Sequence, residues 1–244
     1  MHFVDHIFIL LLFVVQPIYG AYSFRRYLAR IEAGTPANRP RMYLETLVLE
    51  WVFLAALALA WYTLARPIAD LGFVAPAGVG FWSGAALLVL FTAYLVYAWH
   101  GIKQASDDDR AKQAKSLGKL VHMLPHNRRD YRHFIAVSLT AGVVEEIVYR
   151  GFVLWYLSLL MPLWGAVIVS SVAFGLGHSY QGAIGGLRCG LVGLAFAILY
   201  VVTGSIWLPI IAHAALDILQ GASILEILRK DRAVAKPQLA LPGD

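Results

Sequence analysis

Three ionisable residues stand in an apolar stretch of the chain, where charge is costly. Glu145, Glu146 and Arg150 lie within the run 134–160, in the string Val-Val-Glu-Glu-Ile-Val-Tyr-Arg. An ionised side chain at membrane depth costs about 2.5–3.5 kcal/mol even on mild scales, so such residues are rare and functional by default. A positioned carboxylate can act as a general acid or base. The run therefore indicates a catalytic site inside a membrane.

Helix geometry separates these three charges into a pair and a single group. Residues four apart share one face of an α-helix, so Glu146 and Arg150 can pair, whereas Glu145 projects about 100° away. We expect Arg150 to neutralise Glu146, which leaves Glu145 free to act as a general base. The alternative is a purely structural ion pair that locks two helices together.

Two histidines and an aspartate stand on later apolar segments. His178 ends the string Phe-Gly-Leu-Gly-His at the expected cytoplasmic end of its segment, where a purely structural role is also open. His213 and Asp217 are again four residues apart, so Asp217 can orient the imidazole, or both groups can address one substrate atom. Taken alone, this pair fits helix-to-helix bonding equally well. Because each helix must turn its charges away from lipid, we expect all these groups to meet in one cavity, reached from the cytoplasmic half.

The elements that carry these residues are predicted to be membrane helices. Of the 244 residues, 59% are hydrophobic and 14% are charged, whereas a soluble domain carries about 25% charged residues. Windows of about 20 apolar residues mark transmembrane helices. The expected fold class is therefore all-α, a polytopic bundle of about seven spans. We place these spans at 3–24, 43–65, 79–100, 134–160, 163–179, 186–203 and 205–226.

The positions of the basic residues predict the orientation in the membrane. If the chain crosses the membrane seven times, all of the 20 Lys and Arg residues except Arg66 and Arg150 fall on the same side. This count places Arg188 in the loop before the span 186–203. The positive-inside rule puts this side in the cytoplasm, the N-terminus outside and the C-terminus in the cytoplasm. The net charge of +5 thus describes topology, and we expect no nucleic-acid partner.

The expected segments form three regions. Residues 1–133 hold three membrane helices and a basic elbow, which the charges and helical apolar spacing of 100–133 predict to be an amphipathic helix on the cytoplasmic leaflet. Residues 134–228 form a catalytic four-helix core, and 229–244 form a cytoplasmic tail that is frayed from Ala233. Asp5 and His6 precede the first apolar run and its basic cluster follows, which favours a retained helix over a signal peptide.

Two isolated residues receive structural interpretations. Glu50 lies about two turns inside the second span, where we expect it to pair with a neighbouring helix. Cys189 is the single cysteine, so an intramolecular disulfide and a cysteine-based metal cluster are excluded, and we expect it to be a small packing residue.

The polar patterns resemble those of a known family, the CAAX prenyl protease and bacteriocin-processing (CPBP, or Abi) intramembrane proteases. That family carries Glu-Glu-x-x-x-Arg, Phe-x-x-x-His and His-x-x-x-Asn/Asp on separate helices. The chain has the three motifs in this order, at 145–150, 174–178 and 213–217. The resemblance implies that Glu145 activates the attacking water and that His178 helps to hold it. It also implies that His213 and Asp217 face the oxyanion or support its ligands, while Glu146 and Arg150 order the site.

The resemblance leaves the cofactor open between zinc and no metal, because the family has been described both as metalloproteases and as metal-independent glutamate proteases. Glu145, His178 and His213 would satisfy a catalytic zinc set in number. Eukaryotic CAAX proteases have Asn where this chain has Asp217. An amide can donate a hydrogen bond to an oxyanion, whereas an ionised carboxylate repels it. Asp217 is therefore expected to stay protonated, to orient His213 or to bind a metal.

Three classes of function fit these patterns. The leading hypothesis is an intramembrane endopeptidase of the bacterial inner membrane that cleaves a peptide or a protein's C-terminal segment near the cytoplasmic face. The second is a non-catalytic immunity or scaffold protein, against which the unpaired Glu145 argues. The third is a proton-coupled transporter, which the confinement of polar residues to one half disfavours. The expected partners are membrane lipid and the peptide or protein substrate.

Overall fold

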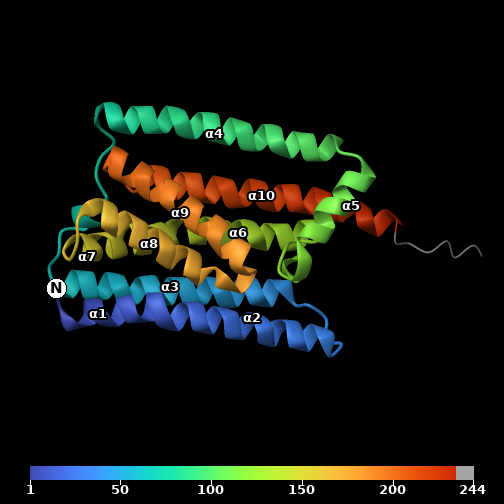
Figure 1. Ribbon diagram of the computed structural model, residues 1–244, viewed down its shortest axis with the longest axis horizontal. Helices are drawn as coiled ribbons and strands as arrows, with labels where there is room; N and C mark the ends of the chain where they lie inside the picture. Colours follow the sequence, from blue (N-terminus) through green and yellow to red (C-terminus); the bar gives the residue numbers. More distant parts are fainter. Residues whose placement is uncertain (235–244) are drawn as a thin grey trace, which may run out of the picture.

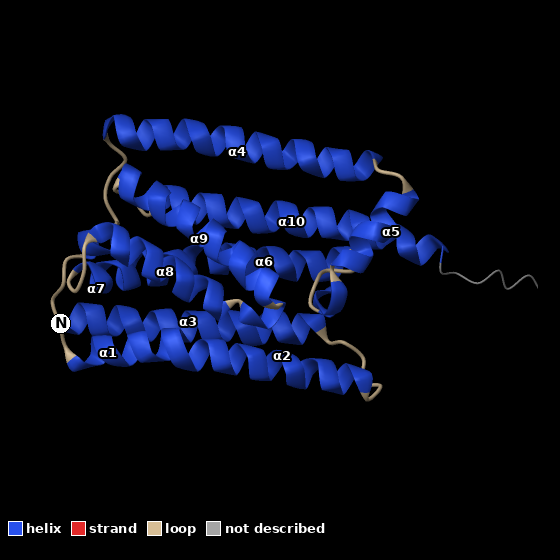
Figure 2. Cartoon of the chain, in the orientation of Figure 1, coloured by secondary structure: helices blue, strands red, loops and turns tan. Residues whose placement is uncertain are grey.

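The computed structural model describes residues 1–234, and all regular structure in that part of the chain is helical (Figure 2). In chain order the elements are α1 (Phe3–Leu10), the π-helical turn η1 (Leu11–Val15), α2 (Gln16–Glu32), α3 (Arg39–Thr63), η2 (Ile68–Leu71), α4 (Gly78–Gln104), α5 (Asp107–Ser116), η3 (Gly118–His122), α6 (Arg128–Glu146), the π-helical segment η4 (Ile147–Val153), α7 (Leu154–Ser158), α8 (Leu163–Gly177), η5 (Ser179–Gln181), α9 (Ala183–Thr203) and α10 (Trp207–Val234). The all-α fold class is confirmed for these residues.

The long helices lie side by side in a bundle, with α4 on one flank and α1 and α2 on the other (Figure 1). We call the end where α5 and the α2–α3 connection lie the basic end, because most of the Lys and Arg residues fall there. Five of the helices are long and apolar enough to cross a membrane: Phe3–Glu32, Arg39–Thr63, Gly78–Gln104, Ala183–Thr203 and Trp207–Leu228. The chain is therefore an integral membrane protein.

The seven predicted spans each have a helical counterpart. Two of these counterparts do not meet the criteria of length and apolarity for a membrane span. The helix that runs through α6, η4 and α7 carries the internal charges, and α8 has only 15 residues. The number of complete crossings and the sides of the termini stay predictions.

The helix formed by α6, η4 and α7 lies at the centre of the bundle. It begins where the side chain of Asn127 accepts a hydrogen bond of 2.8 Å from the backbone N–H of Asp130, a standard N-cap. Every residue of η4 is buried, and Phe152 and Val153 are fully enclosed. A helix surrounded on all sides can hold charge only where neighbouring helices supply partners.

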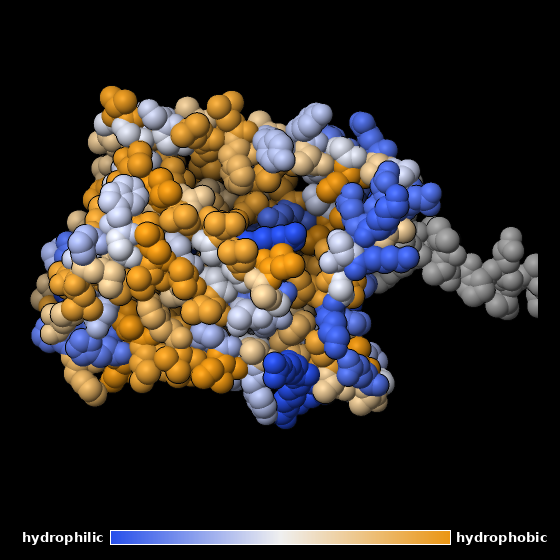
Figure 3. Space-filling view, viewed as in Figure 1, coloured by the Kyte–Doolittle hydropathy of each residue, from blue (hydrophilic) through white to orange (hydrophobic). Residues whose placement is uncertain are grey.

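Close packing brings α10 against this central helix. A Cβ atom at Gly142 would lie 3.0 Å from the backbone nitrogen of Ala214 and 3.0 Å from the carbonyl oxygen of Ile210. Glycine therefore lets the two backbones approach, as small residues do in membrane bundles. The large apolar side chains that the bundle exposes cover its middle, whereas hydrophilic side chains gather over α5 (Figure 3).

The elbow differs from the prediction of one amphipathic helix. The α-helix ends at Ser116, and Gly118 adopts a left-handed backbone conformation (φ +53°) before the short 3₁₀ helix η3. The hydroxyl groups of Tyr27 and Tyr43 donate hydrogen bonds of 3.1 and 2.6 Å to the carbonyl oxygens of His122 and Met123. The elbow is thus tied to α2 and α3.

Two further predictions need correction or remain open. Arg188 does not lie in a loop but in the second turn of α9, because that helix already begins at Ala183. The tail expected at 229–244 begins as a continuation of α10, which extends to Val234. The rest of the predicted tail, 235–244, lies outside the described residues.

A buried ion pair closes the opposite end of the bundle. The guanidinium group of Arg66 donates two hydrogen bonds, of 2.8 and 2.7 Å, to the carboxylate of Asp5. The same group lies over the rings of Trp61 and Trp155, at 5.0 and 4.7 Å from their centroids. This pair holds the first helix against α3 and α7. The sequence showed both charges but not that they meet.

Candidate active site

The turn between α8 and α9 lies inside the length of the bundle, well short of the basic end (Figure 1). In this turn, the ring of Tyr180 packs against Phe24 of α2, with centroids 5.7 Å apart. Phe24 lies eight residues before Glu32, the end of α2, which corresponds to about 12 Å of helix. His178 follows the last residue of α8, at the end of its helix as predicted, and this end of α8 lies short of the basic end of the bundle (Figure 1).

The depth of this turn has a physical consequence. The 15 residues of α8 span only about 22 Å, which is less than the roughly 30 Å of a hydrocarbon core. Non-helical backbone at membrane depth is tolerated only where protein buries it or where it lines a water-filled cavity. Figure 3 shows blue, hydrophilic atoms in a hollow near the middle of the bundle, among apolar and intermediate side chains. The α8–α9 turn therefore favours water access to the centre of the bundle from the basic end.

Glu146 is the hub of a buried ionic cluster. Its Oε1 atom accepts hydrogen bonds from Nη1 of Arg150 at 2.9 Å and from Nδ1 of His213 at 2.7 Å. Glu146 is completely buried, and Arg150 and His213 are 1% and 6% exposed. Arg150 also donates to the carbonyl oxygen of Gly193 at 2.9 Å, which ties α9 to the cluster. The predicted ion pair between Glu146 and Arg150 is present, and it includes His213, which the helix spacing alone could not show.

Glu145 points away from this cluster and toward His178. Its Oε2 atom is buried, has no hydrogen-bond partner within residues 1–234, and lies 4.0 Å from Nε2 of His178. Nδ1 of His178 donates a hydrogen bond of 2.8 Å to the carbonyl oxygen of Phe174, because a carbonyl can only accept. The ring nitrogen that faces Glu145 is thus Nε2. Both side chains are partly exposed, at 19% and 16%, so this side of the cluster is the open one.

Asp217 completes the histidine pair on α10. Its Oδ2 atom lies 3.7 Å from Nε2 of His213, whose other nitrogen is bonded to Glu146. Its side chain is 32% exposed, against 7% for His213. His213 is therefore held between two carboxylates, one buried and one at the open side.

An aromatic residue joins the parts of the site. The guanidinium of Arg150 lies 4.6 Å from the ring centroid of Phe174, and the rings of His178 and His213 lie 4.7 and 6.1 Å from it. A cation over the face of an aromatic ring is attracted by the ring's quadrupole. Phe174 therefore orients the arginine and both histidines at once, which gives its place in the Phe-x-x-x-His motif a physical reason.

The site also contains a residue that the sequence interpretation assigned elsewhere. Glu50 of α3 lies within electrostatic range of Glu145, His213 and Asp217, and no ion pair joins it to another of the described residues. Its Oε2 atom is buried without a hydrogen-bond partner among the described residues. Its position two turns inside an apolar span was the available signal, but no pattern showed which helix α3 would face.

The structure does not bring the three possible zinc ligands together. In the described part of the chain, no three His, Cys, Asp or Glu side chains are grouped so that they could hold a metal ion. The reason is visible at His213, whose two ring nitrogens face Glu146 and Asp217 rather than Glu145 and His178. The set Glu145, His178 and His213 therefore does not fit a three-ligand metal centre in this arrangement, and we derive no step through a metal.

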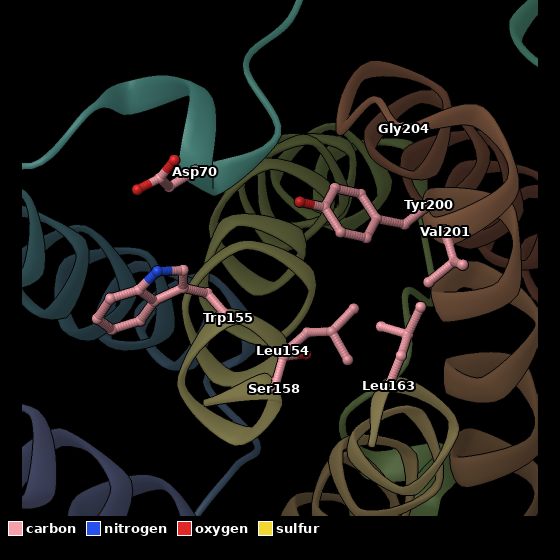
Figure 4. Close-up of a pocket in the computed structure, with 8 residues that line it drawn as sticks. All are labelled: Asp70, Leu154, Trp155, Ser158, Leu163, Tyr200, Val201 and Gly204. Carbon is pink, nitrogen blue, oxygen red and sulfur yellow. The ribbon is translucent and has the colours of Figure 1, made fainter. Parts of the chain in front are cut away.

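Two cavities lie apart from the six predicted site residues. One, of about 240 Å³, lies between η2, α7 and α9; its lining includes Asp70, Trp155, Ser158 and Tyr200 (Figure 4). The other, of about 340 Å³, is an apolar groove between α8 and α9 that extends to Ser179 in the deep turn. Neither is lined by a residue of the ionic cluster.

Fold and site together define a helical membrane protein with a buried cluster of glutamates, histidines and an arginine. Residues 129–219 match a family model described as Rce1-like, Type II CAAX prenyl endopeptidase. The resemblance that the three motifs predict is confirmed over these residues, which include all three motifs. Glu50 lies outside the matched residues. Comparison with curated proteins and with solved structures gave no match.

Proposed function

We propose that the protein is an intramembrane endopeptidase in which Glu145 activates the water that attacks the peptide bond. The observation that carries this proposal is the contrast between the two adjacent glutamates. Oε1 of Glu146 is bonded to Arg150 and His213, whereas Oε2 of Glu145 is buried, unbonded within the described residues and 4.0 Å from His178. A carboxylate left without a protein partner beside a histidine is suited to act on a proton.

The first step concerns the water molecule. Oε2 of Glu145 and Nε2 of His178 are close enough for one water to hydrogen-bond to both. Glu145 takes a proton from this water while the oxygen attacks the carbonyl carbon of the substrate. Positioned general bases contribute about 10²–10⁴-fold to such reactions.

The second step concerns the charge that develops on the carbonyl oxygen. Nδ1 of His213 donates to Glu146, and its Nε2 lies 3.7 Å from Asp217 at the open side of the cluster. A protonated His213 offers its Nε2–H at the open side of the cluster, where it can donate to an oxyanion. The carbon–nitrogen bond then breaks, and the leaving nitrogen takes the proton held by Glu145.

The buried cluster would act by position. Arg150 and Glu146 do not face the open side, but they hold His213 and, through Phe174, the ring of His178. The basic end of the bundle is the cytoplasmic side under the positive-inside rule. A substrate segment would therefore reach the site from the cytoplasm, beside the deep α8–α9 turn.

The test is proteolysis of a library of membrane-anchored peptides by the purified protein in lipid vesicles. Wild type and Glu45→Gln, an exposed carboxylate on α3 paired with Arg41, should cleave the same peptides at similar rates. Glu145→Gln should lose cleavage by about 10²-fold or more. Cleavage that survives Glu145→Gln would overturn the mechanism, and absence of cleavage by any form would favour a non-catalytic protein. A parallel reaction with a strong chelator, and then with added zinc, decides the metal requirement.

A further inference from the structure

The mechanism above leaves one buried acid unused. Glu50 reaches the site from α3, in the half of the chain that carries none of the three motifs. Its Oε2 atom is buried and has no hydrogen-bond partner within residues 1–234. Buried polar atoms almost always have a partner, so an unpartnered one needs an explanation.

The position of Glu50 is set by the packing of α3 on the central helix. The adjacent residue, Trp51, donates a hydrogen bond of 3.2 Å from its indole nitrogen to the hydroxyl oxygen of Thr140 on α6. Thr140 lies five residues before Glu145, so this contact anchors α3 close to the level of the catalytic base. Glu50 interacts electrostatically with Glu145 as well as with His213 and Asp217 on α10.

The charges around Glu50 distinguish it from the other acids of the site. Each other acid has a basic group within 4.0 Å: Glu146 has Arg150 and His213, Glu145 has His178, and Asp217 has His213. The described residues give Glu50 no such partner. Two other carboxylates and His213 lie within its electrostatic range, and His213 is already bonded to Glu146. A buried carboxylate without a cation takes up a proton rather than staying ionised. Glu50 is thus the acid of the cluster that can donate a hydrogen bond.

We propose that Glu50 is a further catalytic residue, whose protonated carboxyl group donates a hydrogen bond to the carbonyl oxygen of the scissile peptide bond. This inference rests on the proposed function, because it needs a peptide at Glu145. No proton is transferred: Glu145 accepts and returns the proton of the reaction, while Glu50 and His213 stabilise the oxyanion as donors. Two carboxyl groups of opposite protonation state would then serve one site, a division known from other enzymes. Helix α3 would then supply a donor to the oxyanion beside the one that His213 supplies from α10.

The protonation of Glu50 can be measured without a substrate. Infrared difference spectra at neutral pH compare wild type with Glu50→Gln, both purified in lipid vesicles. We expect the variant to lose a carbonyl stretch of a protonated carboxylic acid. The matched control, Glu45→Gln, should lose an ionised carboxylate band instead, because Glu45 is 60% exposed and paired with Arg41. Loss of an ionised carboxylate band in Glu50→Gln would overturn the proposal.

The catalytic role is tested by comparing two substitutions in the peptide cleavage assay. Glu50→Gln keeps a hydrogen-bond donor of the same shape, and we expect it to retain cleavage within about tenfold. Glu50→Leu removes the donor and should lower kcat by about 10²–10³ with little change in KM, as for other oxyanion donors. Equal cleavage by Glu50→Leu and wild type, or equal losses in both variants, would contradict the role. Thermal unfolding of each variant separates a folding defect from a catalytic one.

The cleavage results distinguish a failure of the proposed function from a failure of the role of Glu50. If wild type cleaves no peptide, the proposed function fails and the catalytic role of Glu50 fails with it, whatever the infrared spectra show. If wild type cleaves and Glu145→Gln does not, but Glu50→Leu cleaves normally, only the inference about Glu50 is wrong.

Discussion

Replacing Arg150 by Met should destabilise the protein by about 3–5 kcal/mol, the typical cost of removing one partner of a buried ion pair. The substitution removes a hydrogen bond of 2.9 Å to Glu146 and another of 2.9 Å to the carbonyl oxygen of Gly193. It also removes the cation 4.6 Å from the ring of Phe174. The completely buried carboxylate of Glu146 would keep only His213 as a basic partner.

The chain offers a matched control for this substitution. Arg41 and Glu45 have the same four-residue spacing and the same N···O distance of 2.9 Å, but their side chains are 74% and 60% exposed. Exposed pairs contribute about 0–1 kcal/mol, so Arg41→Met should hardly change stability. The free energy of unfolding is measured by denaturant titration in detergent micelles. The double variant Glu146→Gln with Arg150→Met should recover part of the loss, because no buried charge is then left unpaired by the missing arginine.

The reasoning would be refuted if Arg150→Met were no less stable than Arg41→Met. The pairing would also be refuted if the double variant lost as much free energy of unfolding as the Glu146→Gln and Arg150→Met variants together. Additive losses would mean that the two side chains do not interact. Cleavage activity should follow stability only in part, because Arg150 also positions His213 through Glu146.

Three further predictions test the supporting structure. Gly142→Val should destabilise the protein by about 1–3 kcal/mol and abolish cleavage, because the new side chain meets the backbone of Ala214 and separates α6 from α10; normal cleavage would contradict the close approach. Arg66→Met should lower the free energy of unfolding by about 3 kcal/mol or more, since the buried carboxylate of Asp5 loses its arginine and keeps the backbone N–H of His2; an unchanged denaturation midpoint would count against a folded-state pair. A cysteine at Ser179, in a cysteine-free background, should react with a membrane-impermeant thiol reagent added at the basic end and not at the opposite end; the reverse pattern would contradict the water-filled approach to the turn.

Much of the fold could be predicted from apolar run length alone. Runs of about 20 apolar residues recur as helices in the structure, because in lipid the backbone must satisfy its own hydrogen bonds. What the run length could not show is depth. The predicted span 163–179 corresponds to α8, but run length does not show that the turn after it packs against Phe24 of α2, short of the basic end (Figure 1). Tertiary contacts with α2, and not local composition, determine where this turn lies.

The site could be predicted in part for a similar reason. Helix spacing predicts that Glu146 and Arg150 pair, since both lie on one helix. The bond between Glu146 and His213 joins residues 67 positions apart, and the place of Glu50 depends on how α3 rotates against α6. Neither follows from periodicity. Periodicity likewise does not show that His213 turns its two nitrogens to Glu146 and Asp217, away from the other two possible zinc ligands.

Cleavage of a membrane-anchored peptide by wild type and by Glu145→Gln, run in water enriched in oxygen-18, tests the central claim most directly. We expect wild type to release a fragment with one heavy oxygen in its new carboxylate. A Glu145→Gln variant with the same melting temperature as wild type should release no detectable fragment. Efficient cleavage by folded Glu145→Gln would contradict the account, as would a wild-type product without the heavy oxygen.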